Sequence, residues 1–168
     1  MTQVAIFIGS ASDEEAVAPC AEVLRKLGIG FLFTVTSAHR TPERTEELVL
    51  TLEKEGCQVF ICAAGLAAHL AGAVAARTLK PVIGIPVTAS SLGGLDALLA
   101  TVQMPPGFPV ATVALDKAEA RNAAWLAAQI LALDDAPLAE RLRLAREEFK
   151  TEVAAAGAEL AKRHGATA

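Results

Sequence analysis

A histidine and an arginine lie side by side in a short polar stretch, Ser-Ala-His-Arg-Thr-Pro, between Ser37 and Pro42. The stretch follows an extended apolar run and precedes a helical pattern, so both side chains lie where a strand gives way to a helix. The imidazole of His39, with an ordinary pKa of about 6.5, can give and take a proton near neutral pH. The guanidinium of Arg40 has the charge and fork geometry that suit a phosphate. His39 is therefore a candidate general acid/base, the alternative being a histidine that only bridges backbone groups beside Thr41.

A second polar stretch, which includes Ser10 and Asp13, follows the apolar run Val4–Ile8. The pattern Ser-Asp-Glu-Glu from Ser12 matches a capping box and predicts that a helix begins there. Ser10 and Asp13 are then candidates to bind a ligand at a strand exit. The alternative for Asp13 is an acidic residue that only interacts with the helix dipole.

The elements that must position these residues alternate regularly between short apolar runs and helical patterns. This alternation predicts one α/β domain with three layers, a five-stranded parallel sheet between helices, and right-handed crossovers. The expected strands are 4–8, 31–36, 59–63, 81–86 and 110–114, and the expected helices are 12–27, 42–55, 66–77, 95–102 and 118–133.

Ligands of open parallel sheets bind beyond the carboxyl ends of the strands. Most polar residues outside the predicted helices fall at that edge, together with several helix N-termini that favour anions. The third strand exit is different, because it consists of small residues from Ala63 to Ala68 interrupted by Leu66. These residues either exclude water from a pocket or only permit close packing. His69, in the first predicted turn of the next helix, is expected to be a packing or interface residue.

The composition excludes several classes of protein. The chain has 168 residues, a net charge of −4 and 53% hydrophobic residues, so it has no basic surface for nucleic acid and is not disordered. Its three cysteines lack metal or disulfide spacing, which favours a reducing cytoplasm. No apolar run approaches the ~20 residues of a membrane span, and we expect a soluble protein without a targeting segment. No dinucleotide, ATP or metal motif occurs, so we expect chemistry without a cofactor.

The last segment, 136–168, differs from the domain predicted over residues 1–135. Its apolar residues recur every three or four positions and predict one helix of roughly 25 residues, longer than such a domain needs. We expect part of this apolar stripe to pack on a neighbouring subunit. The alternative is a helix that lies across its own domain with a frayed tail. The stripe consists of Leu138, Leu142, Ala145, Phe149, Val153, Ala156 and Leu160.

With these motifs in view, the chain resembles the class I N5-carboxyaminoimidazole ribonucleotide mutases of purine biosynthesis, the PurE family. The resemblance extends from about Val4 to Leu133. Its motifs are Gly-Ser-Ala-Ser-Asp at 9–13, Ser-Ala-His-Arg-Thr-Pro at 37–42, Ala-Ala-His-Leu at 67–70, Pro-Val-Ile-Gly-Ile-Pro-Val at 81–87, Gly-Leu-Asp-Ala-Leu-Leu at 94–99, Val-Gln-Met-Pro at 102–105 and Pro-Val-Ala-Thr-Val-Ala at 109–114.

The resemblance implies a flavodoxin-like, doubly wound fold, a homo-octamer and a small ribonucleotide substrate. It implies transfer of a carboxyl group from the exocyclic nitrogen to ring carbon C4 without ATP, metal or biotin. His39 would be the general acid/base, and Ser10, Asp13 and Arg40 would hold the ribonucleotide, with Arg40 at the phosphate. The full substrate-binding set that we expect is Ser10, Asp13, Ser37, Arg40, Ala64, Gly65 and Leu66.

Two positions depart from the family pattern, which commonly has glycine at position 66 and proline at position 71. Leucine resists positive φ, so either the loop needs no left-handed residue at Leu66 or its shape is altered. Two alternative functions stay open, and the second is favoured if Leu66 blocks the pocket. One is direct carboxylation of aminoimidazole ribonucleotide with CO2, the class II activity, and the other is a non-catalytic nucleotide-binding module.

Overall fold

The molecule is built on one sheet of five parallel strands in the order β2-β1-β3-β4-β5. The structure is a computed structural model that describes residues 1–165. The strands are β1 (Val4–Ile8), β2 (Phe31–Val35), β3 (Val59–Gly65), β4 (Val82–Val87) and β5 (Ala111–Thr112). This order confirms the flavodoxin-like fold. The predicted fifth strand is too long, because only two of its residues pair with β4.

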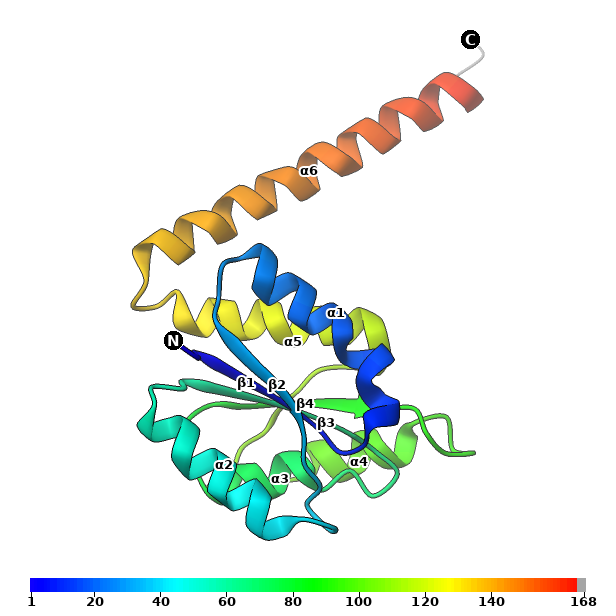
Figure 1. Ribbon diagram of the computed structural model, residues 1–168. Helices are drawn as coiled ribbons and strands as arrows, with labels where there is room; N and C mark the ends of the chain where they lie inside the picture. The colour runs from blue at the N-terminus through cyan, green and yellow to red at the C-terminus, as the bar shows by residue number, and fades with distance from the viewer. Residues whose placement is uncertain (166–168) are drawn as a thin grey trace.

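Helices cover both faces of the sheet (Figure 1). α1 and α5 lie on one face, and α2, α3 and α4 lie on the other. The helices are α1 (Glu14–Lys26), α2 (Pro42–Lys54), α3 (Leu70–Ala75), α4 (Leu95–Val102), α5 (Asp116–Leu131) and α6 (Ala136–His164), and a 3-10 turn, η1 (Ala11–Asp13), precedes α1. The three-layer α/β/α architecture expected from the alternating pattern is confirmed. None of the helices in residues 1–165 is both long enough and apolar enough to cross a membrane.

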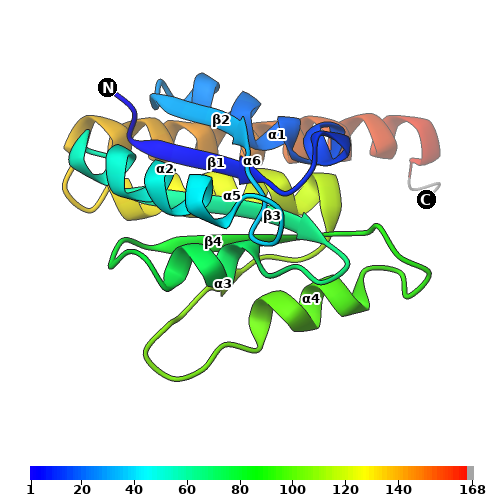
Figure 2. The same cartoon turned by 60° about the horizontal axis from the view of Figure 1, so that its bottom comes forward.

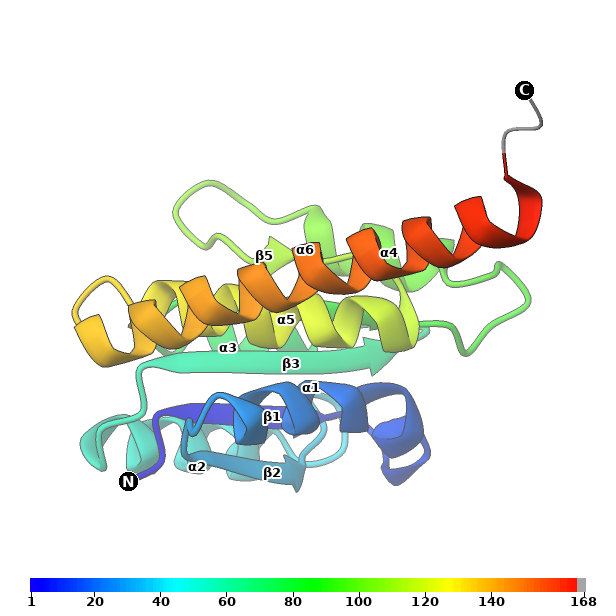
Figure 3. The ribbon, with the colours of Figure 1, turned by 90° about the horizontal axis from the view of Figure 1, so that it is seen from above.

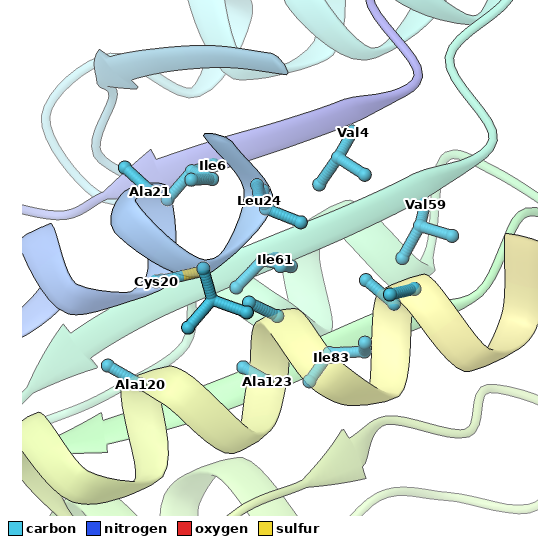
Figure 4. Close-up of a cluster of buried hydrophobic side chains, with 14 of the residues drawn as sticks. Val4, Ile6, Cys20, Ala21, Leu24, Val59, Ile61, Ile83, Ala120 and Ala123 are labelled. Atoms are coloured by element: carbon cyan, nitrogen blue, oxygen red, sulfur yellow. The ribbon is translucent and has the colours of Figure 1, made fainter. Parts of the chain in front are cut away.

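The central strands are buried on both faces, which explains why their sequences are continuous apolar runs. Every residue of β1 is buried, and Val4 lies opposite Phe31 on one side and Val59 on the other. Figure 4 shows side chains of β1, β3 and β4 meeting those of α1 and α5. The face that α5 presents to this core is made of small residues without exposed surface, namely Ala120, Ala123, Ala124, Ala127 and Ala128.

α6 crosses over α5 and then extends beyond the body of the domain (Figures 2 and 3). Its first half packs on its own domain, where Leu138 and Ala145 are buried and the Phe149 ring meets Trp125 with centroids 5.6 Å apart. The second half is exposed from residue 150 onward, including Val153, which is 74% exposed. The predicted stripe therefore divides into a part covered by its own domain and a part left open.

Candidate functional site

The candidate site lies where the direction of winding changes in the sheet. β1 and β3 are neighbours, but α1 and α3 leave them toward opposite faces of the sheet, so a crevice opens between the two strand exits. A cavity of about 480 Å³ occupies this place, within the usual size range of small-molecule sites. All eight predicted site residues line it, namely Ser10, Asp13, Ser37, His39, Arg40, Ala64, Gly65 and Leu66.

The first wall comes from the exit of β1, and its local structure differs from the prediction. Ser10, not Ser12, forms the capping box. The Ser10 hydroxyl accepts a hydrogen bond from the Ser12 amide at 3.4 Å, and the Asp13 carboxylate accepts one from the Ser10 amide at 3.2 Å. The capped element is η1, and α1 begins only at Glu14. The predicted start at Ser12 is wrong because the earlier serine satisfies the free amides first.

Asp13 is buried at the base of this wall, with 7% of its surface exposed. Burial raises the pKa of its carboxyl group, while hydrogen bonds from the Ser12 hydroxyl and the Ser10 amide act in the opposite direction. A carboxylate here accepts hydrogen bonds from the hydroxyl groups of a ligand and repels a phosphate. The arrangement therefore favours a sugar near Asp13 and an anionic group elsewhere in the cavity.

The raised pKa of Asp13 predicts a pH-dependent change in stability. The folded state holds this proton more tightly than the unfolded chain, so stability falls as pH rises from 3.8 through the raised pKa. Asp13→Asn is expected to be more stable than the wild type at pH 7, and this advantage should shrink as the pH is lowered toward 4. Urea unfolding midpoints between these values measure the difference. A difference that does not change with pH would contradict the prediction.

The second wall is the exit of β2, which hydroxyl groups fold into a tight loop. The Thr41 hydroxyl accepts a hydrogen bond from the Ser37 amide at 2.9 Å and donates to the Ser37 carbonyl at 3.2 Å. Thr41 takes the N-cap position of α2, but its side chain makes no capping bond to the helix, and Pro42 is the first helical residue. Beneath the loop, the buried hydroxyls of Thr36 and Thr45 are 2.8 Å apart. This network fixes the loop that carries His39 and Arg40.

Arg40 joins the first two walls. Its Nη2 donates a hydrogen bond of 3.3 Å to the carbonyl of Gly9, and its amide donates one of 3.2 Å to the Ser37 hydroxyl. The side chain is exposed, and Arg40 is the only arginine or lysine among the described residues that line the cavity. A phosphate bound in this cavity would therefore meet its full positive charge at Arg40.

His39 is paired with a second histidine that sequence reasoning missed. Its Nε2 lies 2.8 Å from Nδ1 of His69, and the two rings meet edge to face with centroids 4.9 Å apart. One proton between these nitrogens fixes which of them donates, and it leaves Nδ1 of His39 as the nitrogen free for other partners. His69 is exposed and lines the cavity, so it is not a packing residue of the core, and its expected role at an interface stays a prediction. The motif Ala-Ala-His-Leu was the sequence signal that could have identified it.

The pairing predicts a role for His69 in orienting His39. His69→Phe removes the hydrogen bond and is expected to lower kcat about tenfold, since one such bond contributes about 1.4 kcal/mol. His69→Asn, whose amide can replace Nδ1 as a partner, should retain more activity. The measurement is the pH profile of kcat/KM. A lost partner of His39 should change the shape of this profile, whereas a general loss of folding should lower kcat/KM at every pH. Equal activity of His69→Phe and the wild type would contradict the assignment.

The third wall is the exit of β3. Leu66 adopts a left-handed conformation with φ of 54°, so the loop does need a left-handed residue and keeps that shape with leucine in place. This settles the question that the family pattern left open. The turn also delays the helix, because the amides of Ala68 and His69 bond to carbonyls only two residues earlier. α3 accordingly begins at Leu70 and not, as predicted, near residue 66.

Comparisons of the sequence with known proteins identify one family. The family model described as AIR carboxylase matches residues 3–152. N5-carboxyaminoimidazole ribonucleotide mutase of Methanocaldococcus jannaschii is 51% identical over 150 residues, which cover 89% of this chain and 92% of that protein. The Escherichia coli K12 protein of the same name is 47% identical over 151 residues, covering 90% and 89%.

A comparison with solved structures finds proteins of the same group. The crystal structure of Treponema denticola PurE matches with a TM-score of 0.85 and 28% identity, covering 94% of this chain and 97% of that one. The resemblance inferred from the motifs at the strand exits is confirmed. The chain belongs to the AIR carboxylase family.

Proposed function

We propose that the protein converts N5-carboxyaminoimidazole ribonucleotide to its C4-carboxylated isomer, without ATP, as an isomerase of purine biosynthesis. One observation carries the proposal. A proton-transferring histidine, one arginine and a buried carboxylate line the same cavity, and small apolar residues form the wall between them. The names of the relatives support the same reaction.

His39 supplies the proton transfers. In its protonated form it gives a proton to the exocyclic nitrogen as the bond from nitrogen to the carboxyl carbon breaks, and CO2 leaves. The electron-rich C4 then attacks CO2, and neutral His39 removes the hydrogen from C4, which restores the aromatic ring. His39 ends in the protonation state in which it began. A positioned acid/base of this kind contributes about 10²- to 10⁴-fold to the rate.

The other walls bind the ribonucleotide. Asp13 accepts hydrogen bonds from the ribose hydroxyls and Ser10 lies beside it, while the guanidinium of Arg40 binds the phosphate. This division follows from charge, since Asp13 would repel the phosphate that Arg40 attracts. Ala64 and Gly65 lie beside the reacting carbon and leave room for CO2.

Two assays with different substrates test the proposal. The protein is supplied either with the N-carboxylated isomer or with aminoimidazole ribonucleotide and bicarbonate, both without ATP. Conversion of the first substrate is expected. Activity only with the second would favour direct carboxylation, the activity named in the description of the family. Absence of turnover with both would favour a nucleotide-binding module.

We further propose that the protein works as a homo-octamer. Two features support association. The second half of α6 is open, and α4 exposes an apolar stripe of Leu95, Leu99 and Val102, which are 54%, 46% and 47% exposed. Light scattering should give the mass of an octamer, whereas a monomer would contradict the proposal.

The cytoplasm is the proposed location. Cys20 and Cys57 are buried free thiols, and burial raises their pKa values to about 12 and about 11. Such thiols are inert and need no oxidising compartment. Fractionation that places the protein in the soluble cytoplasmic fraction would agree with this.

A further inference from the structure

Leu66 occupies a position that is unfavourable for leucine in two ways. Its φ of 54° is left-handed, a conformation that is unfavourable for a residue with a side chain. Its apolar side chain is 56% exposed, so it gains little from burial. Within residues 1–165, more than half of its surface is left without packing that would offset the unfavourable φ.

The other non-glycine residue with positive φ among residues 1–165 shows what compensation looks like. Asp116 has φ of 65°, and its carboxylate accepts a hydrogen bond of 2.8 Å from the amide of Thr88. That bond ties the end of β4 to the start of α5. Leu66 cannot form such a bond, so its uncompensated backbone conformation points to a role outside the fold.

The surroundings of Leu66 indicate what it does. Two large aliphatic side chains line the cavity, Leu66 and Leu70, and Leu70 is only 2% exposed. The rest of this wall consists of small residues such as Ala64 and Ala67. Leu66 both lines the cavity and remains exposed, so it lies at the mouth.

The backbone beneath Leu66 is held firmly. A side chain on the preceding Gly65 would bring its Cβ to 2.6 Å from Cβ of Ala89 and 3.0 Å from the carbonyl of Val87. The exits of β3 and β4 are therefore in close contact at this point. Leu66 projects from a fixed base, and its side chain has rotamer freedom because it is exposed.

We infer that Leu66 is an apolar cover at the mouth of the cavity, which keeps CO2 inside and water outside between the two carboxyl-transfer steps. This rests on the proposed function. CO2 is small and carries no net charge, so charged groups hold it only weakly, and a barrier is needed to keep it in place until C4 attacks. The barrier acts after the bond from nitrogen to the carboxyl carbon breaks. It therefore determines which fraction of the released CO2 is attacked by C4 and which fraction escapes to solvent.

Two small substitutions separate the cover from the backbone strain. Leu66→Ala removes the side chain and keeps the strained conformation, whereas Leu66→Gly removes both. In each variant the mouth of the cavity is open to water, so more CO2 escapes. The fraction of consumed substrate that ends as aminoimidazole ribonucleotide is expected to rise at least about fivefold. Leu66→Gly should also melt about 2–4 °C above Leu66→Ala, since glycine adopts positive φ freely. Leu66→Met, which keeps a large apolar side chain, should lose no larger fraction of its substrate as aminoimidazole ribonucleotide than the wild type.

Isotope exchange provides the direct measurement. Unlabelled substrate is converted in the presence of ¹³C-bicarbonate and carbonic anhydrase, and label in the C4 carboxyl group is determined by mass spectrometry. The wild type and Leu66→Met should incorporate little label, and the alanine and glycine variants much more. Uncatalysed loss of the carboxyl group is measured without enzyme and subtracted.

The outcomes are distinguishable. If the wild type forms no C4-carboxylated product from the N-carboxylated isomer, the proposed function fails. If all four proteins form it with equal incorporation of label and equal loss, the function stands and the cover is rejected. A wild type that is labelled as strongly as Leu66→Ala would also reject it.

Discussion

His39→Asn is expected to lower kcat about 10²- to 10⁴-fold with little change in KM. Asparagine keeps a polar side chain but cannot carry a proton, so both proton transfers lose their acid/base. KM should change little because Arg40 and Asp13 still hold the ribonucleotide. Steady-state kinetics with the N-carboxylated isomer measures both constants.

His164→Asn is the matched control for this variant. His164 is the last residue of α6 and lies outside the cavity, so its substitution should leave kcat unchanged. Unaltered turnover of His39→Asn would remove His39 from the mechanism. The fold should be preserved, because the loop is fixed by the hydroxyls of Thr36, Thr41 and Thr45 and not by the imidazole.

Arg40→Met is expected to raise KM about 10- to 100-fold with a smaller effect on kcat. The methionine side chain keeps much of the length and removes the charge. A hydrogen bond to a charged group contributes about 1.5–3 kcal/mol, and each 1.4 kcal/mol corresponds to a factor of ten. Arg40→Lys should give an intermediate KM, since it retains the charge without the fork.

Arg44→Met, on the helix that follows the loop of Arg40, provides the control for loss of a nearby positive charge. Arg44 lies outside the cavity, where its guanidinium donates to the carbonyl of Val35 and the hydroxyl of Thr34. Its KM should equal that of the wild type. Equal KM values for Arg40→Met and Arg44→Met would show that Arg40 does not bind the phosphate.

The sequence was sufficient to predict the sheet because its central strands, β1, β3 and β4, are buried on both faces. β1 and α4 have the predicted boundaries, since each apolar pattern ends at a clear polar or glycine signal. β5 was predicted too long, because apolar character does not reveal how many residues find a partner. The position of the eight site residues was predictable from one rule, that parallel strands end at the same edge.

Features set by contacts between loops were not predictable. Ser10 and Ser12 are equally good N-caps in sequence, and only the turn of η1 selects the first. His69 followed a run of small residues that looked helical, and the left-handed Leu66 shifted it into contact with His39. The backbone conformation of Leu66 thus determines that His69, three positions later, contacts His39. A local sequence pattern does not predict this contact.

The alanine face of α5 limits how this protein can change over evolution. Its five buried alanines leave no room above the sheet for a larger side chain, and an added methyl group there would displace the helix or a strand. A larger residue at this face therefore requires a second substitution, to a smaller residue at the position that it contacts. The helix packs on α1, β3 and β4, so any such displacement would also reach the elements whose ends border the cavity.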